Sequence, residues 1–107
     1  MTTILHKNEY WTYEIAAGQT SYGWYVGPWD DLTRGVFVVT ATPWSLVAGT
    51  TNMHRPQTLE VSEPREHAVP ITTDVGIRTQ WYVYFDIWNR GDYGVKQWYL
   101  NWCLILP

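Results

Sequence analysis

A chain of 107 residues with a formal net charge of −3 has the length of one domain and is long enough to bury a hydrophobic core. Its seven Lys and Arg residues are scattered singly, which argues against a surface that neutralises nucleic-acid phosphates or anionic lipids. No apolar run approaches the length of about 18 residues that a transmembrane helix requires, and no apolar secretion segment follows Met1. We therefore expect residues 1–107 to form one cytoplasmic domain, unless the protein is released by a non-classical route.

The residue patterns predict strands and no helices. No segment repeats apolar residues at helical spacing between caps, whereas alternating β-branched and aromatic residues dominate. Turn residues recur roughly every 8–12 positions, which is the rhythm of a sandwich or a small barrel. Pro43 should end one strand, because proline has no N–H for a neighbouring strand, and Pro70 should confine another to a sheet edge. The strands predicted before residue 80 are 9–16, 22–26, 36–41, 44–48, 58–62 and 68–72.

The strongest strand signal lies between Gln80 and Leu106. Two β-branched and aromatic runs, 80–88 and 95–106, flank a short segment rich in Asn, Gly and Asp, which is typical of an antiparallel hairpin. Successive side chains of a strand point to opposite faces. One face of the first run carries Trp81, Val83, Phe85 and Ile87, and the other carries Tyr82, Tyr84, Asp86 and Trp88. Because the second face is also aromatic, it should be covered by another element, another subunit or a ligand.

These patterns together predict an all-β fold. We expect a single antiparallel β-sandwich, jelly-roll or immunoglobulin-like, with about seven or eight strands and the hairpin 80–106 at its centre. The single cysteine, Cys103, excludes an intramolecular disulfide and should be a small buried hydrophobe. The predicted core contains Trp11 or Tyr13, Val38, Leu59, Val61, Trp81, Val83, Phe85, Leu100 and Trp102.

Catalysis and metal binding have little support in the sequence. His6, His54 and His67 lack a Cys or His at metal-ligand spacing, and no nucleophile elbow, phosphate loop or zinc-protease motif occurs. Asp30 and Asp31 could offer oxygen ligands to calcium, but adjacent Asp residues in a turn commonly bond to their own backbone. The sequence therefore predicts a protein that is not an enzyme and holds no cofactor and no metal.

Aromatic residues beside polar turns are the strongest functional signal in a chain with eight Trp and eight Tyr. The apolar faces of sugar rings stack on Trp and Tyr, while Asp, Asn and Arg side chains bond the hydroxyls. Loops presented by a rigid sheet are where binding residues usually lie. Two loops combine these residue types, and this predicts a non-catalytic, lectin-like protein that binds carbohydrate. The predicted ligand-binding residues are Trp29, Asp30, Asp31, Trp88, Asn89, Arg90, Asp92 and Tyr93.

Self-assembly is the alternative interpretation of the same aromatic residues. Strands that carry Tyr and Trp in place of charge on both faces are typical of homo-oligomer interfaces. Such a domain would be a structural or assembly module, for example of a particle or a toxin. The two functions are compatible, because small β lectins gain avidity by forming oligomers. They differ in the position of the exposed aromatic residues, which would lie either in pockets or in symmetric protein contacts.

Overall fold

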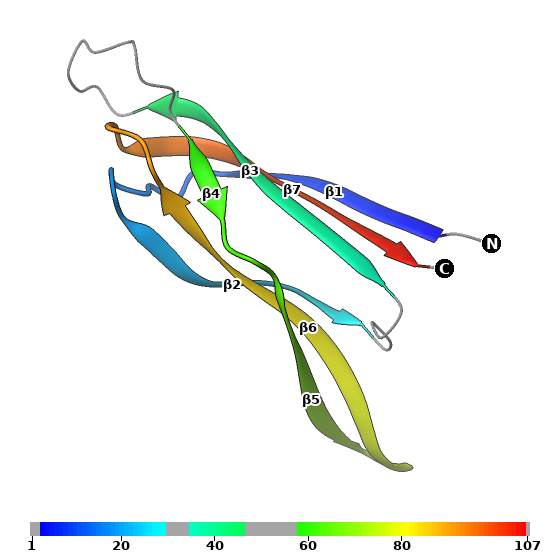
Figure 1. Ribbon diagram of the computed structural model, residues 1–107. Helices are drawn as coiled ribbons and strands as arrows, with labels where there is room; N and C mark the ends of the chain where they lie inside the picture. Colours follow the sequence, from blue (N-terminus) through cyan, green and yellow to red (C-terminus); the bar gives the residue numbers. More distant parts are fainter. Residues whose placement is uncertain (1–2, 30–34, 47–57, 107) are drawn as a thin grey trace.

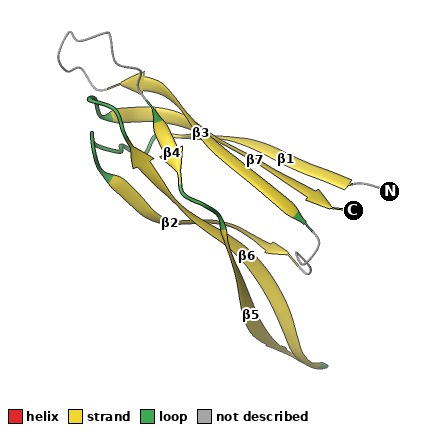
Figure 2. Cartoon of the chain, in the orientation of Figure 1, coloured by secondary structure: helices red, strands yellow, loops and turns green. Residues whose placement is uncertain are grey.

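The computed structural model describes residues 3–29, 35–46 and 58–106 of the chain, which form an all-β structure with no helix (Figures 1 and 2). The predicted antiparallel β-sandwich is confirmed, since two antiparallel sheets pack face to face. No helix in these ranges has the length and apolar character needed to cross a bilayer. The strands are β1 (Thr3–Trp11), β2 (Thr20–Trp29), β3 (Val36–Leu46), β4 (Leu59–Val61), β5 (Arg65–Thr73), β6 (Gly76–Asn89) and β7 (Val95–Leu106).

Each sheet is built around one long strand. The first sheet has the order β1-β7-β3, with β7 in the middle. The second has the order β2-β6-β4, and β5 pairs with β6 along the stretch that precedes the β4 pairing. Figure 1 shows β5 and the first half of β6 extending away from the first sheet as an arm. This arm explains why the radius of gyration is 16.8 Å, against about 13 Å for a compact chain of this length.

The predicted pairing of the runs 80–88 and 95–106 is wrong, although both runs are strands at the centre of a sheet. β6 pairs with β2, β4 and β5, whereas β7 pairs with β1 and β3 in the opposite sheet. The physical reason is that both runs have a strongly apolar face. In a hairpin these faces would lie side by side and need a third element, whereas in opposite sheets they pack directly on each other.

The core lies between β6 and β7, as the alternation of their side chains predicts. Of the predicted core residues, Leu59, Val83, Phe85 and Leu100 are buried. Val61, Trp81 and Trp102 are partly buried and pack against the core. Trp11, Tyr13 and Val38 are exposed, so their assignment to the core is wrong; Val38 pairs with Cys103 on the outer face, while Phe37 and Leu104 beside them point inward. The full set of buried hydrophobic residues is Ile15, Ala41, Leu59, Val83, Phe85, Ile87, Val95, Trp98, Leu100 and Leu104.

The two prolines confirm one prediction and correct another. Pro70 lies in β5, which is an edge strand as predicted. Pro43 does not end β3, which continues to Leu46. β3 is itself the edge of its sheet, so a missing N–H need not interrupt a ladder, and the register with β7 shifts directly after Pro43.

β2 contains two bulges where it pairs with β6. Between Ser21 and Trp24, and again between Val26 and Trp29, β2 contains one residue more than the facing stretch of β6. A glycine with positive φ occupies each bulge: Gly23 at 80° and Gly27 at 134°. Glycine is favoured there because it has no Cβ to restrict these angles. A Cβ on Gly27 would also lie 2.9 Å from the carbonyl oxygen of Trp81.

Gly27→Ala is expected to lower the free energy of unfolding by about 2–3 kcal/mol, because it adds a steric clash to an unfavourable φ. The matched control is Gly23→Ala, which has the same sign of φ but nothing within 4 Å of the added Cβ. We expect the control to lose only about 1–2 kcal/mol. Urea unfolding of the two variants measures the difference, and equal losses would contradict the role of the contact with Trp81.

Candidate functional site

The two predicted binding loops lie at opposite ends of β2 and do not form one site. Trp88 pairs with Thr20, the first residue of β2, whereas Trp29 is the last residue and pairs with Trp81. Roughly 25–30 Å of strand therefore separates the two tryptophans. Asp30 and Asp31, which the sequence places next to Trp29, lie outside the described residues.

The first group surrounds Trp88. Its side chain is exposed and lines a cavity of about 250 Å³ together with Thr20, Glu60, Ser62 and Asp86. We call this the Trp88 cavity. The Arg90 guanidinium lies 5.0 Å from the centre of the Trp88 ring, and its Nη1 atom is 3.0 Å from Glu60 Oε2. A cation–π contact and an ion pair thus hold Arg90 over one face of the indole. That face is already covered within the protein.

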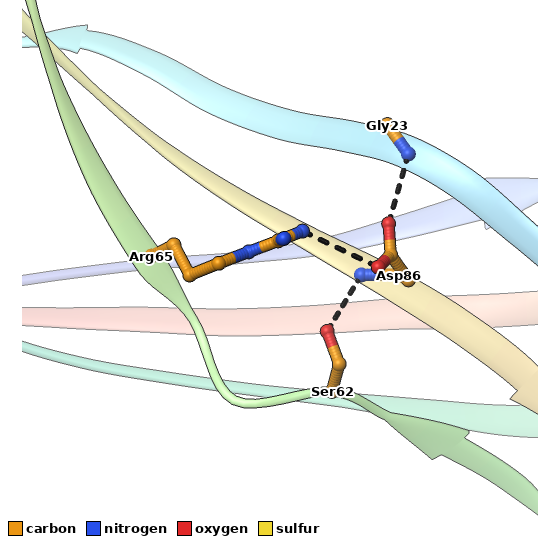
Figure 3. Close-up of polar contacts among 4 residues, drawn as sticks. All are labelled: Gly23, Ser62, Arg65 and Asp86. Atoms are coloured by element: carbon orange, nitrogen blue, oxygen red, sulfur yellow. Dashed lines mark hydrogen bonds and ion pairs between the residues drawn. The ribbon is translucent and has the colours of Figure 1, made fainter.

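Asp86, in the same cavity, connects three segments of the second sheet (Figure 3). Its Oδ1 atom accepts a hydrogen bond of 3.0 Å from the Gly23 N–H, and its Oδ2 atom is 3.3 Å from Arg65 Nη2. The backbone N–H of Asp86 donates to Ser62 Oγ at 2.8 Å. The residue therefore ties the first bulge of β2 to the link between β4 and β5. The carboxylate contacts of Asp86 therefore indicate that this residue stabilises the second sheet.

Asn89 and Tyr93 hold the connection between β6 and β7. Asn89 is fully buried, and its Nδ2 atom donates to the carbonyl oxygens of Ile15 at 2.9 Å and Tyr93 at 2.7 Å. Its Oδ1 atom accepts from the Gly91 N–H at 2.9 Å. Tyr93 is half-buried and Asp92 is exposed. Because the Asn89 amide is used inside the protein, we leave Asn89 out of the site proposed below.

The second group surrounds Trp29. This half-buried residue lines a cavity of about 280 Å³ between β1 and β2, which are the edges of the two sheets in the described part of the chain. We call it the Trp29 cavity. The ring centres of Trp29 and Trp102 are 5.7 Å apart with an interplanar angle of 73°, an edge-to-face contact that fixes both rings. The residues that line the cavity are Lys7, Glu9, Tyr25, Val26, Gly27, Pro28, Trp29 and Trp102.

The Trp29 cavity is lined by residues with polar groups from two strands, β1 and β7. Lys7 Nζ lies 3.3 Å from Glu9 Oε1, and both residues come from β1. The Nε1 atom of Trp102, on β7, is buried and has no hydrogen-bond partner among the described residues. A buried N–H without an acceptor costs about 1–3 kcal/mol, so a ligand oxygen that accepted from it would recover that free energy.

Comparisons with known proteins leave the site to be interpreted from its own geometry. No protein-family model, curated protein or solved structure matches this chain. In the described ranges, no group of three or more His, Cys, Asp and Glu side chains is placed to hold a metal ion. A function must therefore be inferred from the aromatic faces and the hydrogen-bonding groups of the two cavities.

The sequence identifies Trp29 but misses most of the residues around it. Lys7 lies before the predicted first strand, 9–16. Glu9 lies within it, but side-chain alternation does not indicate which other strand its face packs against. Trp102 is predicted to be core, and it packs partly buried against the core while it also lines the cavity. The available signal was Gly27-Pro28 directly before an aromatic residue, because bulges often re-aim side chains next to binding sites.

Proposed function

We propose that the chain is a non-catalytic carbohydrate-binding protein and that the Trp29 cavity is its binding site. The observation that carries this proposal is a cavity lined by the edge-to-face pair Trp29 and Trp102, in which the buried indole N–H of Trp102 has no acceptor among the described residues. Cavities that combine aromatic walls with a few convergent polar groups are typical of small-molecule sites. A sugar complements both features, because its ring has an apolar C–H face and its edge carries oxygen acceptors.

Four of the residues that line the cavity have separate roles in this proposal. The Trp29 ring stacks on the sugar, and its contact with Trp102 orients it before binding, which lowers the entropy lost on association. Trp102 Nε1–H donates to a sugar oxygen. The Glu9 carboxylate accepts from hydroxyl groups and the Lys7 ammonium donates to them, while their ion pair keeps the local charge near zero.

Trp29→Ala is expected to weaken binding of the preferred sugar at least tenfold, because the stacking surface is removed. The preferred sugar is identified on a glycan array and its dissociation constant is then measured by isothermal titration calorimetry. Trp44→Ala is the matched control, since Trp44 is an exposed indole on the outer face of the first sheet. Circular dichroism confirms that both variants fold.

Three outcomes of this experiment are distinct. Loss of affinity in Trp29→Ala with unchanged affinity in Trp44→Ala supports the site. Equal affinity of a folded Trp29→Ala variant and the wild type would refute the site while leaving the sugar-binding function in place. If the wild-type protein binds no sugar on the array, the proposed function itself is wrong.

Homo-oligomeric assembly is the second candidate, favoured by the apolar residues outside the core. Ile4, Val36 and Val38 are exposed, and their pairing with Ile105 and Cys103 of β7 places them on the outer face of the first sheet. Apolar patches of this kind commonly mark protein contacts. Light scattering after size exclusion distinguishes the candidates: a defined oligomer that binds no sugar would favour assembly, and a monomer would count against it.

A further inference from the structure

A second aromatic cavity lies at the first bulge of β2. Its volume is about 500 Å³, and Gly23 forms part of its wall as Gly27 forms part of the wall of the Trp29 cavity. We call it the Trp11 cavity. None of the described residues that line it is charged. These residues are Trp11, Tyr13, Ser21, Tyr22, Gly23, Trp24 and Tyr25.

The two cavities adjoin along the open side of the sandwich. Tyr25 lines both of them. On β1, alternate residues line one cavity and then the other: Lys7 and Glu9 belong to the Trp29 cavity, and Trp11 continues the same face into the Trp11 cavity. On β2, the two bulge glycines are four residues apart, a distance of about 13 Å. The cavities therefore follow each other along the same two edge strands as one elongated groove.

The Trp11 cavity has the aromatic surface that sugar stacking requires. Trp24 forms its inner wall, with edge-to-face contacts to Trp11 at 4.8 Å and to Tyr13 at 6.0 Å between ring centres. The indole N–H of Trp24 already donates to Ser21 Oγ at 2.8 Å, so this ring offers its surface and not a free donor. Tyr22 and Tyr25 are exposed at the rim. A neutral ring with an apolar face suits this cavity better than a charged group.

We propose that the two cavities are subsites of one groove and that its ligand is a neutral, linear oligosaccharide with several sugar rings. This inference rests on the proposed carbohydrate function and adds the length and charge class of the ligand. One part of the chain occupies the Trp29 cavity, where Lys7, Glu9 and Trp102 bond its oxygens. A neighbouring part stacks in the Trp11 cavity, and Tyr25 contacts the chain between them.

The shape of β2 favours a glycan over an extended peptide in this groove. A peptide strand that joins a sheet edge needs a regular row of backbone donors and acceptors. Two bulges interrupt that row in β2, and Pro28 lacks an N–H. The charged pair Lys7 and Glu9 also lies on the facing edge, β1, and charged side chains are a common means of blocking strand addition. Recognition through side-chain surfaces is therefore favoured over backbone pairing.

The test measures affinity as a function of glycan length. A series from monosaccharide to hexasaccharide of one neutral sugar is titrated into the wild type, Tyr22→Ala and Trp29→Ala, with calorimetric detection. Tyr22 is 78% exposed, so its truncation should leave the fold intact. Tyr10→Ala is the control for loss of an exposed tyrosine outside the groove, since Tyr10 packs with Trp44 and Tyr99 on the outer face.

We expect wild-type affinity to rise at least tenfold from the monosaccharide to the hexasaccharide. Tyr22→Ala should lose most of that gain and keep the monosaccharide affinity, Trp29→Ala should lose affinity at every length, and Tyr10→Ala should match the wild type. Equal affinity for all lengths, with Trp29→Ala still impaired, would overturn the extended groove and leave the proposed function standing. Absence of binding to any sugar would reject both. Binding of an unstructured peptide that Tyr22→Ala abolishes would also overturn the assignment of a glycan to the groove.

Discussion

Replacing Trp98 with alanine is expected to lower the free energy of unfolding by about 3–5 kcal/mol, a large part of the 5–15 kcal/mol typical of a domain. Trp98 is fully buried on β7. Its ring meets Trp24 of β2 edge-to-face at 5.1 Å, and so joins the two sheets. Its Nε1–H donates to the Tyr13 carbonyl oxygen at 2.7 Å. The substitution therefore removes packing between the sheets and leaves a backbone acceptor without that donor.

The control for this loss is Trp44→Ala, because Trp44 is 62% exposed and its ring meets Tyr10 and Tyr99 on the outer face of the first sheet. We expect the control to change stability by less than about 1 kcal/mol. Guanidinium unfolding monitored by circular dichroism compares the two variants. If Trp98→Ala fails to fold, Trp98→Phe keeps most of the ring and should lose about 1–3 kcal/mol through the lost hydrogen bond. Similar losses for Trp98→Ala and Trp44→Ala would show that the sheets do not depend on Trp98.

The side-chain alternation of the long strands was predictable, because a strand's period of two is a local property. Val83, Phe85 and Ile87 of β6 are buried, while Trp88 between two buried residues is exposed, as the sequence pattern implies. The partner of each strand was not predictable in the same way. An Asn/Gly/Asp segment between two strands is compatible with a hairpin. Whether the second strand pairs with the first or joins the opposite sheet depends on contacts with residues distant in sequence.

The candidate site was predictable only in part for a related reason. An aromatic residue beside a polar turn marks Trp29 from the sequence alone. The cavity, however, also needs β1 and β7, which lie far away in the chain. Trp81 and Trp102 are assigned to the core by their position on a face, but both are only partly buried where they pack against Val83 and Leu104. A residue on an inward face is buried only where the opposite sheet covers it.

Asn89→Ala is expected to lower the free energy of unfolding by about 2–4 kcal/mol, because it removes three hydrogen bonds made by a buried side chain. Two of them join residues 91 and 93 of the β6–β7 connection to Asn89 itself. The third joins Ile15, whose backbone pairs with Val95 at the start of β7. The main chain of Asn89 adds hydrogen bonds with Gly18 and Gln19 at the entrance to β2. Asn89 is thus the point where the connections at one end of the sandwich meet.

Hydrogen exchange separates this role from a general loss of stability. The amide of Gly91 donates to Asn89 Oδ1, so its protection should fall in Asn89→Ala even under conditions where the whole domain stays folded. Asn8→Ala is the matched control, because the exposed Asn8 side chain bonds Asn101 on the outer face of the first sheet. That variant should lose less than about 1 kcal/mol and leave Gly91 protected. Unchanged exchange at Gly91 in Asn89→Ala would contradict this role. It would mean that the β6–β7 connection keeps its conformation without the Asn89 side chain.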